Sequence, residues 1–177
     1  MNTRSQKTPK QEAIRILNQL QIARAPVPVE KIAKELRAQV RYRPLDDEIS
    51  GMIYIKDDVP IIGVNSLHHP NRQRFTIAHE IGHLVLHRDI MTREVHVDRQ
   101  FHVLMRDDRS ASGTEKIEIQ ANQFAAELTM PHGLLVEALG NQAMDIDDSQ
   151  LVKKLALQFR MSEDAMRIRL STLFFVR

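Results

Sequence analysis

The chain has 177 residues, of which 42% are hydrophobic and 27% are charged, a balance typical of a globular domain rather than a disordered or fibrous chain. Its formal net charge of +2 lacks the basic excess of proteins that hold nucleic acid mainly by charge. The absence of cysteine excludes disulfides and thiolate zinc sites. The N-terminal stretch carries no signal-peptide core and no run is long enough to cross a membrane, so we expect a cytoplasmic protein.

The first part of the chain predicts two helices followed by three strands. Apolar spacing and breaks at proline place helices over 9–23 and 29–36 and strands over 40–43, 51–56 and 60–65. Asp57 and Asp58, between the last two strands, are typical of a hairpin turn. The strand over 60–65 is apolar on both sides, as in a well-covered strand.

The rest of the chain is predicted to be mainly helical. After a polar loop over 68–74, we expect helices over 75–87, 115–130 and 134–139, a strand or hairpin within 94–106, and a helix–turn–helix pattern over 149–173. Ser162 is the expected N-cap of the last helix. The pattern predicts an α+β fold, with a main domain over 1–145 and a helical appendage over 146–177 packed on it.

The predicted helix over 75–87 carries titratable side chains on an otherwise apolar segment. Such a helix is buried, and a buried carboxylate such as Glu80 needs a partner. His79 and His83 lie one turn apart on one face and can aim two imidazole nitrogens at one metal ion. Glu80 can then reach a water on the metal as a general base. The alternative is a core helix whose histidines are satisfied by hydrogen bonds.

A hydrolytic zinc site needs a third protein ligand and an open position. The next strong helix offers Glu118, and Asn122 one turn later can hydrogen-bond the far nitrogen of a ligating histidine. The sequence pattern alone fits a metal ligand and a solvated helix glutamate equally well at Glu118. The rival ligands are Glu115, Glu127 and His87.

Further polar residues are candidates for contact with the substrate or the transition state, a role that a hydrolytic site requires. They are Arg72, His87, His96 and His102. The alternative for His96 and His102 is that they lie on the solvent-exposed face of a hairpin. His68 and His69 stand beside Pro70 and are interpreted as the lead-in to a helix rather than a second metal site.

Two sequence blocks resemble the ImmA/IrrE family of bacterial zinc metallopeptidases. The first runs over 71–87 and includes NRQRFTIAHE and HLVLH, and the second, EIQANQFAAELTMP, runs over 118–131. The segments GMIY at 51–54 and IGVN at 62–65 are also similar, so the likeness covers most of the chain. Two separate blocks in the right order are more specific than the histidine motif alone.

The resemblance implies a minimal gluzincin-like fold with zinc bound by His79, His83 and Glu118 and with Glu80 as general base. Manganese or iron is not excluded by these ligands. In such a fold an extended substrate can pair with an edge strand beside the active-site helix. The strand expected to do so consists of Ile61, Ile62, Gly63, Val64 and Asn65.

The resemblance also implies the partner, because studied members of the family cleave a helix-turn-helix transcriptional repressor. We therefore expect an XRE-type repressor as the substrate, whose cleavage derepresses stress or mobile-element genes. One alternative is a non-catalytic regulator that binds a repressor or toxin. Another alternative is that the C-terminal helices bind DNA through Arg167 and Arg169. The same pattern also fits a helical pair that only packs on the core.

Overall fold

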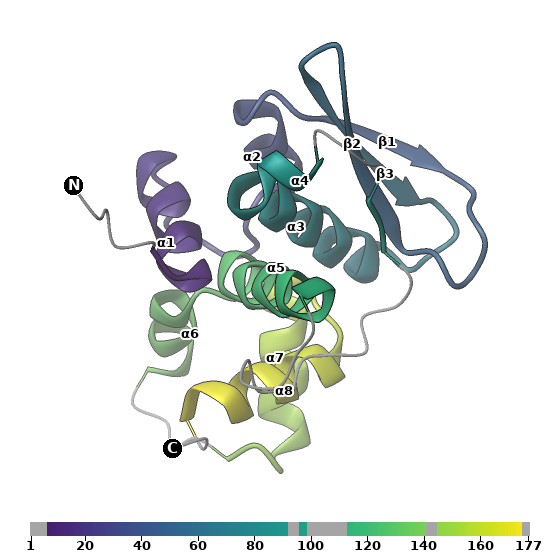
Figure 1. Cartoon of the computed structure of the whole chain (residues 1–177). Helices are drawn as coiled ribbons and strands as arrows, with labels where there is room; N and C mark the ends of the chain where they lie inside the picture. Colours follow the sequence, from purple (N-terminus) through teal and green to yellow (C-terminus); the bar gives the residue numbers. More distant parts are fainter. Residues whose placement is uncertain (1–6, 92–95, 99–112, 141–144, 175–177) are drawn as a thin grey trace, which may run out of the picture.

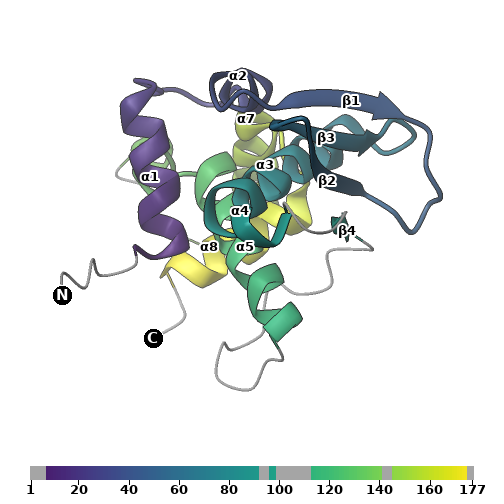
Figure 2. The same ribbon diagram turned by 45° about the horizontal axis from the view of Figure 1, so that its top comes forward.

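The computed structural model describes residues 7–91, 96–98, 113–140 and 145–174, and its fold is of the α+β class (Figure 1). The elements are α1 (Pro9–Gln19), α2 (Val29–Glu35), β1 (Gln39–Arg43), β2 (Gly51–Lys56), β3 (Val59–Asn65), α3 (Pro70–Leu86), α4 (Arg88–Met91), β4 (His96–Asp98), α5 (Gly113–Thr129), α6 (His132–Leu139), α7 (Ser149–Phe159) and α8 (Glu163–Phe174). Helix α3 lies between the sheet and α5 (Figures 1 and 2). Among the described residues, no helix is both long and apolar enough to span a membrane.

The strands form a mixed sheet of order β1-β3-β2-β4. Strands β2 and β3 form the predicted hairpin, and its turn residues Asp57 and Asp58 have φ of 50° and 62°, the left-handed values of a tight hairpin turn. Strand β1 pairs with β3 in parallel, and β4 pairs with β2 in antiparallel fashion. Of the predicted segment 94–106, β4 is the part that falls within the described residues.

The expectation that residues 61–65 form an edge strand for the substrate is wrong. Strand β3 is hydrogen-bonded on both sides, to β1 and to β2, and the outer strands of the described sheet are β1 and β4. The apolar pattern could not reveal this, because side chains point to the two faces of a sheet, whereas an edge strand is defined by its unpaired backbone. Asn65 is fully buried, and its side chain bonds the backbone of the loop before β2 rather than facing a substrate.

Helix α3 begins at Pro70, five residues before the predicted start at 75. Pro70 occupies the first turn, where no backbone N–H is needed, and the ring of His69 accepts a hydrogen bond from Asn71 N. The polar residues that predicted a loop are therefore the first turns of the helix. Their side chains bind neighbouring segments, as when Gln73 Nε2 donates to His68 O at 2.8 Å.

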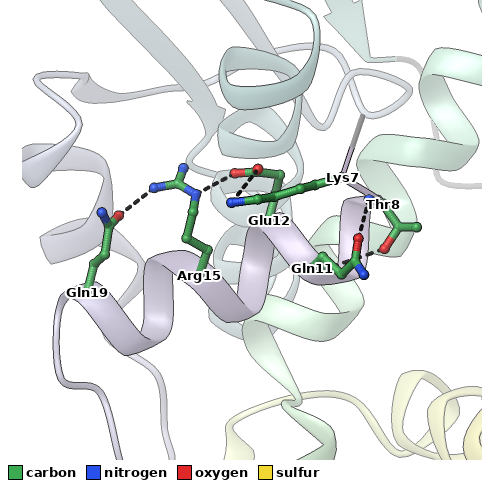
Figure 3. Close-up of polar contacts among 6 residues, drawn as sticks. All are labelled: Lys7, Thr8, Gln11, Glu12, Arg15 and Gln19. Atoms are coloured by element: carbon green, nitrogen blue, oxygen red, sulfur yellow. Dashed lines mark hydrogen bonds and ion pairs between the residues drawn. The ribbon is translucent and has the colours of Figure 1, made fainter. Parts of the chain in front are cut away.

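Helix α1 ends at Gln19, earlier than the predicted residue 23. Its start is fixed by a capping box, in which Thr8 Oγ1 accepts from Gln11 N and Thr8 N donates to Gln11 Oε1 (Figure 3). A polar network continues along the exposed face, with Arg15 Nε 2.7 Å from Glu12 Oε2. The opposite face buries Ala13, Ile16 and Leu17 and packs against α5.

The C-terminal helices α7 and α8 belong to the same hydrophobic core cluster as α1, α2 and α3. Their fully buried apolar side chains are Val152, Leu155, Phe159, Met166 and Leu170. Ser162 caps α8 as predicted, since its Oγ accepts from Ala165 N at 3.1 Å. The helical pair therefore packs on the rest of the chain, while a boundary between domains at residue 145 stays a prediction.

Because α7 shares the main core, truncating its inner face should destabilise the whole chain. We expect Leu155→Ala, at a fully buried position, to lower the free energy of unfolding by about 2–5 kcal/mol in urea denaturation, with a single transition. Leu157→Ala is the matched control on the same helix, because Leu157 is 70% exposed and should cost less than about 0.5 kcal/mol. Equal effects of the two changes would contradict a shared core.

Candidate metal and catalytic centre

Helices α3 and α5 cross in direct backbone contact at Gly82. A Cβ on Gly82 would lie 3.1 Å from Ala121 Cα, 3.1 Å from Ala121 O and 3.2 Å from Phe124 Cδ1. These distances are shorter than ordinary van der Waals contact, so glycine is what allows the two helix axes to approach this closely. The close approach brings Glu118 and Asn122 of α5 beside the histidines of α3.

Three side chains meet where the helices cross. His79 Nε2 lies 2.9 Å from His83 Nε2, and the carboxylate of Glu118 lies 3.2 Å from His79 Nε2 and 3.3 Å from His83 Nε2. Both histidines are fully buried, whereas the Glu118 side chain is 25% exposed, so this group reaches solvent on the glutamate side. The three predicted ligands are thus brought together, and His79, His83 and Glu118 could hold a metal ion.

The nitrogen and oxygen atoms of the three side chains are close enough to share one metal ion. Bonds of about 2.0–2.1 Å imply that neighbouring ligand atoms of a tetrahedral zinc site are about 3.3 Å apart. The two imidazole nitrogens are 2.9 Å apart, and each lies near a different oxygen of Glu118, His79 at 3.2 Å from Oε2 and His83 at 3.3 Å from Oε1. Two imidazole nitrogens and one carboxylate are also the donor set of hydrolytic zinc sites, which keep a fourth position open.

Asn122 lies behind His79, as predicted for a residue that orients a ligand. Its Oδ1 is 3.0 Å from His79 Nδ1, and both side chains are buried. With its Nδ1–H donating to the amide oxygen, His79 presents the lone pair of Nε2 toward Glu118 and His83. Asn122 therefore fixes both the ring orientation and the tautomer that metal binding requires.

Glu80 is fully buried on the same helix, next to His79. One of its oxygens, Oε1, lies against the beginning of β2, where it would be 3.1 Å from a Cβ on Gly51. The carboxylate is thus held between α3 and the sheet and is not one of the three grouped ligands. Glu80 therefore follows a candidate ligand in the chain but lies outside the ligand group, which is compatible with the predicted role of a general base.

The other predicted contacts with substrate are not part of this group. Arg72 donates from Nη2 to Ser50 Oγ at 2.8 Å and so ties α3 to the residue before β2. His87 ends α3, with its ring centroid 5.8 Å from that of His83, and faces a pocket of about 300 Å³ beside Lys7 and Glu12. His102 and the His96 side chain lie outside the described residues.

The rival third ligand Glu127 has a different role. It is buried and forms an ion pair with Arg169 Nη2, whose Nε donates to Met130 O at 3.0 Å. Arg169 is only 4% exposed, so in this structure its side chain belongs to the core and is not presented to DNA, the alternative weighed from the sequence. Arg167 donates to Ile146 O and Ser149 Oγ, which joins α8 to the start of α7.

Two described side chains with shifted pKa values lie at the junction of α2, β1 and α3. Burial raises the pKa of the Tyr42 hydroxyl, and the hydrogen bond that it donates to Glu30 acts in the same direction. Burial lowers the pKa of Arg74, with a smaller contribution from the charge of Arg160. Arg74 Nη2 donates to Val27 O at 2.8 Å, so both residues stabilise the helix–sheet junction.

Two residues near Glu80 escaped prediction from the sequence. Ser50 is fully buried and accepts from Arg72, and a Cβ on Gly51 would lie 3.1 Å from Glu80 Oε1. A glycine within a predicted strand does mark a site where another group approaches closely, and Gly51 carried that signal. The sequence does not say which group approaches, because the neighbour comes from a helix two elements further along the chain.

The family of the chain follows from comparison with known proteins. Residues 33–171 match the model of a peptidase family described as the IrrE N-terminal-like domain, and the chain belongs to this family. The match spans both helices of the candidate metal centre and supports a metallopeptidase-like role. It confirms the family that the two sequence blocks predicted. No curated protein sequence matches the chain.

Among solved structures, a Mycobacterium tuberculosis transcriptional regulator has a similar fold, with a TM-score of 0.62 and 18% sequence identity. The match covers 96% of this chain and 48% of that one, so the chain spans about half the length of that regulator. At this identity the likeness establishes the shared fold.

The contact between Asn122 and His79 predicts an effect on metal affinity. We expect Asn122→Ala to weaken zinc binding about 10–100-fold, because an outer hydrogen bond that orients a ligating histidine is lost. Competition with a colorimetric chelator measures this change. Gln123→Ala, at the next position of α5, is the control and should bind zinc as the wild type does. Equal zinc affinity of the two variants would contradict the role of Asn122.

The buried pair of Arg169 and Glu127 predicts a large stability effect in α8. We expect Arg169→Ala to lower the free energy of unfolding by about 3–5 kcal/mol, since it leaves Glu127 charged and buried without its cation. Arg167→Ala should cost about 1 kcal/mol, because its bonds lie nearer the surface. Chemical denaturation of both variants measures the difference, and a mild effect of Arg169→Ala would contradict the assigned role.

Proposed function

We propose that this protein is a zinc metalloendopeptidase. The observation that supports the proposal is the grouping of His79, His83 and Glu118 beside the buried Glu80, within a chain of a peptidase family. Two imidazole nitrogens and a carboxylate are a donor set that zinc accepts, and the partly exposed Glu118 leaves a side from which a peptide can approach. Manganese and iron accept the same ligands, so metal analysis belongs to the test.

In this proposal His79, His83 and Glu118 hold the ion, and Asn122 keeps His79 in the required tautomer. When bound, zinc polarises the scissile carbonyl and lowers the pKa of a water molecule. Glu80 accepts the proton of the attacking water and delivers it to the leaving amine nitrogen. Its burial keeps bulk water away from the carboxylate and its orientation fixed.

We propose that the substrate is a helix-turn-helix transcriptional repressor of the XRE type in the cytoplasm, whose cleavage derepresses stress or mobile-element genes. The family match supports a peptidase, and the fold is shared with a protein described as a transcriptional regulator. Among the described strands β4 is an outer one, and it pairs with β2 at Gly51, so an extended substrate segment can add to the sheet beside β4.

The test is cleavage of a helix-turn-helix repressor encoded beside the gene. We expect the zinc-loaded protein to cut it at one site, detected by mass spectrometry of the fragments. Glu80→Gln should bind one zinc per chain and cleave about 10²–10⁴-fold more slowly, because the amide cannot accept the proton.

Glu137→Gln is the matched control, because Glu137 is exposed on α6 and away from the metal group. It should cleave at the wild-type rate. Unchanged cleavage by Glu80→Gln would overturn the mechanism. A stable complex of the zinc-loaded wild type with an intact repressor would instead favour a non-catalytic regulator.

A further inference from the structure

One face of α3 packs on the beginning of β2. Arg72, Thr76 and Glu80 follow one another at four-residue spacing and so lie along one stripe of the helix. Arg72 bonds Ser50 Oγ, while Thr76 and Glu80 both lie against Gly51. The candidate general base is therefore the last member of a stripe that lies against Ser50, the residue before β2, and Gly51, the first residue of β2.

The space at Gly51 is too small for a side chain. A Cβ there would lie 2.4 Å from Thr76 Cγ2, 3.0 Å from Gly63 O and 3.1 Å from Glu80 Oε1. The first distance is a clash that requires the helix or the strand to move, and the third is close packing against the carboxylate itself. Gly51 thus sets how near the Glu80 carboxylate lies to β2.

The chain around Gly51 is fixed from several sides. Ser50 O accepts from Asn65 N at 3.0 Å, and Asn65 Nδ2 donates to Ile49 O at 2.9 Å. Together with the bond from Arg72, these contacts hold residues 49 and 50 to both β3 and α3. The beginning of β2 is therefore a preformed surface against which Glu80 rests, rather than a segment that adjusts to it.

We infer that Gly51 is a positioning residue for Glu80. Because glycine has no side chain, β2 can approach α3 closely enough to hold the carboxylate at the distance from the metal group that proton transfer needs. The inference rests on the proposed function, in which Glu80 is the base. Gly51 binds neither the metal nor the proton, but it would help to set the position of the Glu80 carboxylate.

Gly51→Ala tests the inference. We expect kcat on the repressor to fall about 100-fold, since small displacements of a reacting group have effects of this size. KM should stay within about twofold of wild type, because substrate binding is retained. Zinc affinity should also be retained, since the three ligands lie on the α3–α5 side.

Gly63→Ala is the matched control. It makes the same change on the adjacent strand, and its new Cβ would meet the flexible Met52 side chain at 2.9 Å rather than the glutamate. It should retain the wild-type kcat. An equal loss of kcat in both glycine variants would show a general effect of the sheet and would overturn the inference.

A double variant separates positioning from loss of fold. Thr76 Oγ1 is buried without a hydrogen-bond partner among the described residues, so Thr76→Ala removes the clashing methyl group and no recorded bond. We expect Gly51→Ala/Thr76→Ala to regain the thermal stability of Thr76→Ala and to keep the zinc affinity of the single variants. The kcat should remain low, since the close contact with Glu80 Oε1 persists. Recovery of kcat in the double variant would overturn the inference.

Acetohydroxamic acid gives a readout that needs no substrate. Bound to zinc, this probe places a donor beside the neighbouring carboxylate, and loss of a hydrogen bond to a charged group costs about tenfold or more in affinity. Calorimetric titration of the zinc-loaded proteins should show this loss in Gly51→Ala and in Glu80→Gln, but not in Gly63→Ala. Loss in Glu80→Gln alone would overturn the inference. If the probe behaves as expected and no repressor is cut, the repressor is not the substrate, while the role of Gly51 in placing Glu80 beside the zinc site stands.

Discussion

The site depends on the close crossing of α3 and α5 at Gly82 and Ala121. A larger residue at Gly82 would push the helices apart, since its Cβ would meet the backbone of α5 at 3.1 Å. Ligand atoms 2.9–3.3 Å apart tolerate little such displacement. The crossing also brings Asn122 behind His79, so one packing contact fixes both the three grouped side chains and their support.

A second close approach, between α3 and β2, acts on the other side of the same helix. It encloses Glu80 at Gly51 while Arg72 and Asn65 hold the preceding residues. The active-site helix is therefore fixed between two glycine contacts, one toward α5 and one toward the sheet. This arrangement separates the two roles, with the histidines facing the glutamate helix and the carboxylate facing the strand.

The elements predicted well are those whose pattern reflects a local constraint. Asp57 and Asp58 suit a left-handed turn, and the strand over 51–56 is observed with the predicted bounds. The polar first turns of α3 were predicted as a loop because their partners, such as Val27 O and Ser50 Oγ, lie elsewhere in the chain. Arg169 looked like a surface residue of a DNA-reading helix for the same reason, since its partner Glu127 is 42 residues away.

The sequence by itself determined the motif on one helix, the family resemblance and the candidate third ligand, because i, i+4 spacing places side chains on one face wherever a helix forms. The sequence did not decide whether Glu118 is a metal ligand or a solvated glutamate, and it predicted that the substrate pairs with β3. Only the tertiary structure decided that Glu118 meets both histidines and that β3 is an inner strand. The reason is that spacing along a helix or strand is a local property. Which faces meet depends on the packing of segments about 40 residues apart, as between His79 and Asn122.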